Sequence, residues 1–203
     1  MGFASKVSWA HNTERPSLKI KFEEYVKQSL DVGIDRLTLN NNHQAPGCSC
    51  LYLYYKLFRE SGTHAPRCRF ARVTVNGDYV GLHFNVKAIK FNFLTFAFND
   101  NSGALFEGTV TDFMPDWIEK FELKNNAADF PQLRGGADIF VSIASDEEKL
   151  VQLKELIDVD SFISFWAMES LMGFWDGYYA DQNNFYLYRQ TKNNKLYFIP
   201  RGN

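Results

Sequence analysis

The sequence predicts an α+β fold, in which a small and mainly antiparallel sheet is followed by a mostly helical part. Residues 70–86 alternate between apolar and polar side chains on either side of Asn76-Gly77, the dipeptide favoured in tight hairpin turns. Residues 146–174, by contrast, have the capping residues and apolar content of consecutive helices. A second hairpin is expected near the C-terminal end of the sequence.

The first part of the chain is expected to contain short strands and one helix before the hairpin. Residues 18–22 alternate cleanly as a strand, and residues 35–39 form another short strand-like run. Ser49 is placed to cap a helix over residues 51–60. After the hairpin, a helix rich in Phe is expected over residues 88–98.

The second part of the chain includes a stretch with no clear hydrophobic periodicity. Residues 109–138 contain many loop-forming residues, but about thirty residues is long for an unstructured connection, so we expect a helix or the lining of a cleft here. The acidic string that begins at Ser145 predicts a helix over residues 146–156. Asp160-Ser161 is expected to cap the next helix, about residues 161–174.

Composition limits the class of protein. A chain of 203 residues with 45% hydrophobic and 16% aromatic residues forms one domain with an ample core. The net charge is −2 and no basic stripe is present, which argues against a nucleic-acid partner. No apolar run approaches the ~20 residues of a membrane span, and the first residues lack the apolar centre of a signal peptide.

The cysteines do not form a pattern typical of disulfides. There are three, Cys48, Cys50 and Cys68, at irregular spacing, so we expect buried free thiols. Together with His43 and His64, the cysteines include the residue types of a zinc site, which is the alternative. The Cys-x-Cys pair, with His64 four residues before the last cysteine, matches known zinc spacings poorly.

The residues best suited to catalysis or metal binding lie on a short link near the C-terminal end. Before the link, the strongly apolar residues 162–175 predict a buried helix; after it, residues 185–188 and 196–199 predict a buried hairpin. Buried polar groups need hydrogen bonds or a ligand. The link contains two carboxylates and two amides: Asp176, Asp181, Asn183 and Asn184.

A carboxylate followed by an amide has a known use in phosphoryl transfer. The carboxylate accepts a proton from a hydroxyl nucleophile, and the amide oxygen binds Mg²⁺. In protein kinases the Asn follows the Asp by about five positions, whereas Asn183 and Asn184 follow Asp176 by seven and eight. The alternative is structural, since Asp and Asn often cap helices and shape turns. A hydrolase pair of Asp176 and Asp181 is the weakest reading.

Two lysines lie on one face of the strand at residues 18–22. Lys19 and Lys21 alternate with apolar residues, so they share the face opposite to the one directed at the core. A solvated strand face is the commoner explanation. The functional one is that one lysine binds phosphate, as the strand lysine of kinases does.

Several strings, taken in order, resemble the spore-coat-protein CotH kinase family, from about Pro16 to the C-terminus. The match with the strongest signal is Trp175-Asp176-Gly177-Tyr178 together with Asn183-Asn184 and the strand that follows. No single motif is unique, but their order and spacing together are specific. The other matching strings are residues 37–41, 55–59, 65–67, 75–82, 103–108 and 198–200.

The resemblance implies an atypical protein-kinase-like fold of one domain, with a sheet lobe over about residues 16–87 and a helical lobe over about residues 88–203. It implies binding of ATP with Mg²⁺ or another divalent metal, and phosphorylation of Ser in partner proteins, notably spore-coat proteins. Relatives on fungal surfaces are described as host-binding invasins, so a spore coat, a cell surface or secretion is the implied location.

Carried over by position, the resemblance assigns roles to individual residues. Asp176 is implied as the catalytic aspartate. Lys19 or Lys21, with Lys87, would contact the nucleotide. The metal would be held by residues of the link, namely Asn183, Asn184 and Asp181.

The sequence also departs from the family pattern. Lys87 stands in a segment where the family often has an acidic residue, and Gly47 lies where an Asp-Pro-Ser string is usual. The family continues Ile-Pro with Trp and a metal-binding Asp, whereas Arg201-Gly202-Asn203 follows here. We therefore expect a domain incomplete at both ends or a degenerate copy, with weak or absent activity. The alternative function is a non-catalytic surface or coat binding module on the same fold.

Overall fold

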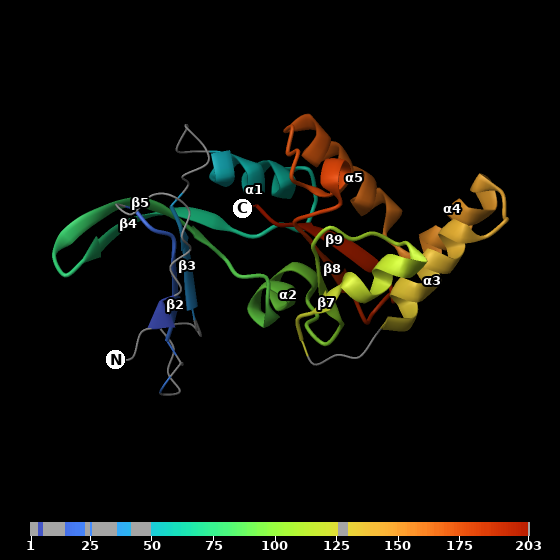
Figure 1. Cartoon of the computed structure of the whole chain (residues 1–203), viewed down its shortest axis with the longest axis horizontal. Helices are drawn as coiled ribbons and strands as arrows, with labels where there is room; N and C mark the ends of the chain where they lie inside the picture. Colours follow the sequence, from blue (N-terminus) through green and yellow to red (C-terminus); the bar gives the residue numbers. More distant parts are fainter. Residues whose placement is uncertain are drawn as a thin grey trace. The chain divides into compact units, whose positions relative to one another are not determined.

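The structure is a computed structural model of the whole chain, which divides into two compact units (Figure 1). Unit 1 comprises Met1–Lys56 and Pro66–Phe93, and unit 2 comprises Leu57–Ala65 and Leu94–Asn203. The fold is α+β with antiparallel sheets, as predicted. The structure describes residues 4–5, 15–22, 25, 36–41, 50–125 and 130–202.

Unit 1 is built on a five-stranded antiparallel sheet with the strand order β1-β2-β3-β5-β4. The predicted hairpin is confirmed: Asn76 and Gly77 both have positive φ, 53° and 97°, as the tight turn requires. The strands at residues 18–22 and 35–39 are also confirmed, each within a residue or two. The strand bounds are β1 Ala4–Ser5, β2 Leu18–Lys21, β3 Arg36–Asn40, β4 Cys68–Val75 and β5 Asp78–Val86.

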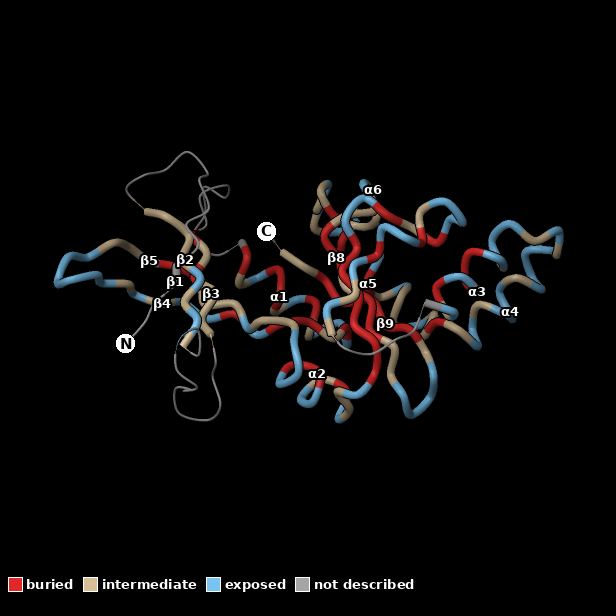
Figure 2. Tube along the Cα trace, turned by 60° about the horizontal axis from the view of Figure 1, so that its bottom comes forward, coloured by how far each residue is buried: buried red, intermediate tan, exposed pale blue. Residues whose placement is uncertain are grey.

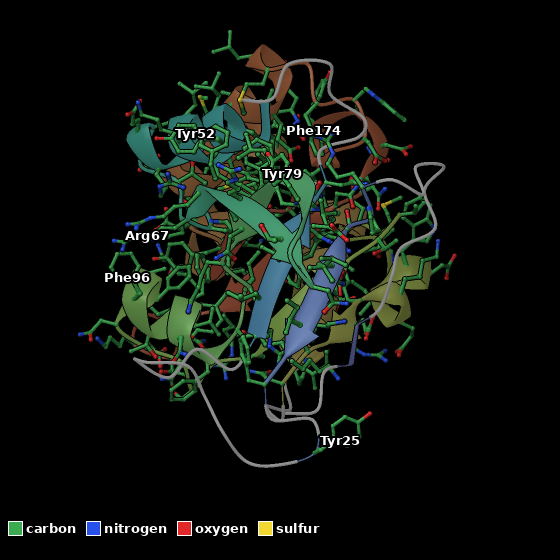
Figure 3. All side chains as sticks on the ribbon, turned by 90° about the vertical axis from the view of Figure 1, so that its left-hand side faces the viewer. Tyr25, Tyr52, Arg67, Tyr79, Phe96 and Phe174 are labelled. Atoms are coloured by element: carbon green, nitrogen blue, oxygen red, sulfur yellow. The ribbon has the colours of Figure 1, made fainter. Side chains whose placement is uncertain are left out.

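Two helices, α1 (Cys50–Glu60) and α2 (Phe91–Phe98), were both predicted. Tyr52 of α1, which is labelled in Figure 3, stacks on Phe70 of β4 with ring centroids 5.4 Å apart. Cys68 is a buried free thiol, as expected. The zinc alternative depends on His43 and Cys48, which lie outside the described residues.

Unit 2 contains a four-stranded antiparallel sheet with the order β7-β6-β8-β9. The predicted C-terminal hairpin is confirmed as β8 and β9, and both strands are largely buried (Figure 2). Phe198 of β9 is central to an aromatic core and lies 4.7 Å from the Phe162 ring and 5.4 Å from the Phe165 ring. The bounds are β6 Leu105–Gly108, β7 Glu122–Leu123, β8 Phe185–Arg189 and β9 Leu196–Pro200.

The helical elements of unit 2 follow the predicted order. Residues 109–138 do carry a helix, since the 3₁₀ helix η2 and the start of α3 both fall in this stretch. The helix at residues 146–156 is confirmed with a complete capping box at Ser145 and Glu148. The bounds are η2 Pro115–Lys120, α3 Phe130–Val141, α4 Asp146–Leu156, α5 Val159–Leu171 and α6 Tyr178–Asp181.

The predicted start of α5 is wrong by about two residues. The cap is Asp158, whose Oδ1 accepts a hydrogen bond from the Ser161 N–H at 3.0 Å, and not Asp160-Ser161. The helix also ends earlier, at Leu171, before Gly173 with φ 62°. Of the residues described, no helix is long and apolar enough to span a membrane.

The expectation that residues 162–175 form a buried helix is also wrong in part. Only Phe165 and Glu169 of α5 are buried, while Trp166 and Leu171 are exposed and Trp175, beyond the helix, is 73% exposed. The reason is geometric: α5 packs one face against β9 through its Phe rings. Apolar composition does not reveal that the opposite face of the helix remains uncovered.

Gly103 is expected to be essential for packing in unit 2. A Cβ at this position would overlap the carbonyl oxygen of Arg189, which is backbone and unable to move aside easily. Gly103→Ala should therefore lower the free energy of unfolding by about 1–3 kcal/mol, the usual cost of overpacking. Urea denaturation measures this effect.

The matched control for this change is Gly135→Ala in α3, where nothing lies within 4 Å of the added Cβ. This variant should be stabilised by about 0.5–1 kcal/mol, because Ala is the better helix former. Equal effects of the two substitutions would contradict the packing assigned to Gly103.

Candidate functional site

The link between α5 and β8 folds back on itself and brings three of the predicted site residues together. Asn183 Nδ2 donates a hydrogen bond to Asp176 Oδ1 at 2.9 Å, and Asn184 Nδ2 donates to the Asp176 carbonyl oxygen at 2.8 Å. The short helix α6 lies between them, with Gln182 at its C-terminal end in the left-handed conformation. Asp176, Asn183 and Asn184 thus form one hydrogen-bonded set.

The two amides have different surroundings. Asn184 is 6% exposed and has φ 54°, a left-handed conformation that Asn tolerates better than most residues. Its side chain bonds the Asp176 backbone, and its carbonyl oxygen accepts the Arg201 N–H at 3.1 Å. Asn184 therefore closes the link and joins it to the end of β9.

Asn183 has an oxygen available for a ligand. Its Nδ2 is used by Asp176, but its Oδ1 is buried and has no hydrogen-bond partner among the residues that the structure describes. A buried acceptor without a donor is costly, and a bound cation satisfies it. An amide oxygen is a type of ligand that Mg²⁺ takes, usually together with water and phosphate oxygens.

The remaining predicted metal ligand, Asp181, lies at the exposed end of α6. Its N–H donates to the Gly177 carbonyl oxygen at 2.9 Å, but its carboxylate makes no hydrogen bond within the described part of the chain. Within those same residues, no group of three or more His, Cys, Asp or Glu side chains could hold a metal. Asn183, whose Oδ1 has no donor among these residues, is therefore the better candidate for a cation ligand.

The predicted nucleotide-contacting lysines belong to unit 1. Lys19 and Lys21 are exposed on β2, where they pair in register with Thr38 and Arg36 of β3. Lys87 is exposed just after β5, and its N–H donates to the Arg67 carbonyl oxygen at 2.8 Å. Because Asp176 is in unit 2, the three lysines remain a prediction of nucleotide contact.

Tyr178 anchors the link in the core of unit 2. Its ring lies 4.8 Å from that of Phe185 and 5.0 Å from that of Phe198. Its hydroxyl donates to Asp112 Oδ1 at 2.7 Å. Burial, followed by the negative charge of Asp112, raises the pKa of Tyr178, so this phenol remains protonated at physiological pH.

A buried carboxylate lies beneath the same link. Glu169 of α5 is fully buried, and its Oε2 accepts the Tyr179 N–H at 2.9 Å. Burial raises the pKa of Glu169 to about 7, and the N–H groups of Tyr179 and Tyr178 oppose this rise. The sequence does hold a signal for this residue, because Glu169 is the single acidic residue within the apolar run 162–175.

Two further residues beside the link were not anticipated. Asp112 lies 66 residues before Tyr178, whose hydroxyl donates to it, so no local pattern points to it. Arg201 pairs with buried Glu107, which also contacts Lys124 Nζ at 2.6 Å. Lys124 and Arg201 hold the pKa of Glu107 below its usual value, against the opposing effect of burial, which is the larger single influence.

Comparison with known proteins shows which family the sequence of this chain matches. Residues 6–201 match the family model described as CotH kinase protein. The chain is 26% identical over 164 residues to a protein of Rhizopus delemar named Invasin CotH7, covering 73% of this chain and 27% of that protein. It is also 26% identical over 159 residues to Spore coat protein homolog 1 of the same fungus, covering 72% and 26%.

A shorter similarity involves Invasin CotH3 of Rhizopus delemar, 36% identical over 58 residues, which is 28% of this chain and 10% of that protein. The chain thus spans about a quarter of the length of the two relatives matched over most of it. Because the family model covers nearly all of its residues, the chain belongs to the CotH kinase protein family.

Proposed function

We propose that this chain is a protein kinase domain that transfers the γ-phosphate of ATP to Ser of a partner protein of a coat or cell surface. The observation that supports the proposal most is the hydrogen bond of 2.9 Å between Asn183 and Asp176, in a chain of the CotH kinase protein family. This bond orients the carboxylate at a fixed place on the link.

Each residue of the site has a role in this proposal. Asp176 accepts the proton of the attacking Ser hydroxyl as general base. Asn183 Oδ1, which has no donor among the described residues, binds the cation, and Asn184 keeps the link closed through the Asp176 backbone. When bound, ATP would supply the phosphoryl group, and its divalent metal would supply the positive charge that neutralises the negative charge of that group. The resemblance assigns Lys19, Lys21 and Lys87 to contact with the phosphates.

The segment after β9 lowers the rate that we expect. Gly202 occupies the position at which the resemblance predicts a metal-binding Asp, with Arg201 in place of Trp. Loss of a single contact to developing charge costs a factor of ~10²–10³ in rate. We therefore propose slow transfer, with Asp181 as the nearest other carboxylate along the chain that could approach the cation.

A thermal-shift titration with Mg²⁺-ATP tests nucleotide binding apart from turnover. A ligand that binds only the folded state raises the unfolding free energy by about 2.7 kcal/mol at a hundred times its Kd. The midpoint of unfolding should rise with millimolar Mg²⁺-ATP. Asn183→Ala should reduce this shift by removing the amide oxygen, whereas Gln152→Ala, an exposed amide on α4, should leave it unchanged.

A non-catalytic binding module is the second candidate function. Two of the similar Rhizopus delemar proteins are named invasins, and unit 2 exposes the large apolar side chains of Trp166, Leu171 and Trp175. Exposed apolar groups of this size are typical of surfaces that bind other proteins. Absence of any thermal shift with millimolar nucleotide would favour this function over the kinase.

A further inference from the structure

We infer that Glu169 is a positioning residue for Asp176: from α5, its carboxylate caps the first turn of α6 and so fixes the turn that presents Asp176. Its consequence for catalysis rests on the proposed kinase function. Its structural part depends only on the contacts between α5 and α6.

The first observation is that α6 lacks a cap of its own. The residue before its first turn is Gly177, which has no side chain to accept the N–H groups at the start of the helix. Glu169 Oε2 accepts the N–H of Tyr179, the second residue of α6, at 2.9 Å. A side-chain cap from Ser, Asp or Asn would make this same bond. Glu169 thus supplies from another helix what Gly177 cannot.

The second observation explains why residue 177 is Gly. Its φ of −98° is open to any residue, so backbone conformation does not require Gly here. Space does: a Cβ at residue 177 would lie 2.5 Å from the Phe174 ring and 2.9 Å from both Cδ and Oε1 of Glu169. The Glu169 carboxylate therefore occupies the volume in which an ordinary capping side chain would begin.

The third observation is the connection from this cap to the candidate base. The Gly177 carbonyl oxygen accepts the N–H of Asp181 at 2.9 Å and that of Asn183 at 3.5 Å. Asn183 in turn donates to the Asp176 carboxylate. A displacement of the first turn of α6 would therefore move Asp176 in two ways. It would act on the backbone through the peptide bond between Asp176 and Gly177, and on the carboxylate through the hydrogen bond from Asn183.

The surroundings of Glu169 argue against a role in stability alone. The residue is fully buried, and its Oε1 has no hydrogen-bond partner among the described residues. Among the described residues, Glu169 interacts electrostatically with Tyr178, whose hydroxyl donates to Asp112, and neither of these groups is a cation. A buried carboxylate with one unsatisfied oxygen is destabilising compared with an apolar residue of the same size.

Four variants of the intact protein test the inference. Glu169→Ala removes the cap, Gly177→Ser adds a capping hydroxyl where the carboxylate stands, and the double variant places that hydroxyl in vacated space. Glu155→Ala, an exposed Glu on α4, is the control. The Phe174 ring lies 2.5 Å from the added Cβ, a cost that both backgrounds of Gly177→Ser share.

The expected result is a difference between backgrounds. Gly177→Ser should lower the unfolding midpoint of the wild-type protein much more than that of Glu169→Ala, because only the wild-type protein keeps the carboxylate in the way of the added side chain. Amide hydrogen exchange over residues 177–183 should accelerate at least about tenfold in Glu169→Ala and slow again in the double variant. In phosphoryl transfer, kcat of Glu169→Ala should fall about 10²-fold with little change in the nucleotide KM, and the double variant should recover part of it.

Two negative results have distinct meanings. If Gly177→Ser lowers the midpoint equally in both backgrounds, and exchange over residues 177–183 does not respond to Glu169→Ala, Glu169 is not the cap and the inference is overturned. If the wild-type protein transfers no phosphate while the midpoints and the exchange rates behave as expected, the kinase proposal fails and the structural role of Glu169 stands.

Discussion

Replacing Asp176 by Asn should lower kcat for phosphoryl transfer to a Ser-containing protein by ~10²–10⁴, the usual contribution of a positioned general base. An amide at residue 176 can still accept the hydrogen bond from Asn183 Nδ2, and the bond from Asn184 goes to the backbone of residue 176. The fold of the link is therefore retained, and the unfolding midpoint should change little. Transfer of labelled γ-phosphate measures the rate.

The control for this variant is Asp160→Asn, which removes an exposed carboxylate from the first turn of α5. Its kcat should equal that of the wild-type protein. Transfer that is as fast in Asp176→Asn as in Asp160→Asn would show that Asp176 is not the base.

Replacing Glu169 by Gln should raise the unfolding free energy at pH 8 and flatten its dependence on pH. The pKa of Glu169 rises from its usual 4.5 to about 7 on folding, because the residue is buried. The folded state therefore binds the proton more tightly than the unfolded state. This contribution to stability is complete below pH 4.5, declines as the pH rises, and is lost above pH 7.

The size of this effect follows from the shift. A rise from 4.5 to about 7 corresponds to about 3 kcal/mol between the two pH limits. Urea denaturation at pH 5 and pH 8 gives the unfolding free energy at each pH. The difference between these two free energies should be smaller for Glu169→Gln than for the wild-type protein, by an amount of this order. The same pH dependence in both proteins would mean that the buried carboxylate does not titrate with folding.

Local sequence signals predicted most of the secondary structure because they act over a few residues. Asn76-Gly77 determines a turn through the φ values that only such residues adopt easily. The capping box at Ser145 is likewise satisfied within one helical turn. The start of α5 was misplaced because Asp158, Asp160 and Ser161, three of four consecutive residues, can each cap a helix.

The site was predictable only where its residues are close in sequence. Asp176 and the two amides are seven and eight positions apart, and the structure joins all three. The contacts from Glu169 and Asp112 depend on the packing of α5 and of the segment after β6, which no local pattern encodes. The left-handed backbone of Asn184 and the Asn183 Oδ1 without a donor among the described residues are two further features that the sequence does not reveal.

The most direct test of the proposed site is paramagnetic broadening of the Asn183 side-chain amide resonances by Mn²⁺-ATP, with Mg²⁺-ATP as the diamagnetic reference. Mn²⁺ prefers the same oxygen ligands as Mg²⁺. The account predicts that the Asn183 resonances broaden strongly at saturating Mn²⁺-ATP, while those of the exposed Gln152 on α4 remain sharp. Sharp Asn183 resonances at nucleotide concentrations that broaden other parts of the protein would contradict the account.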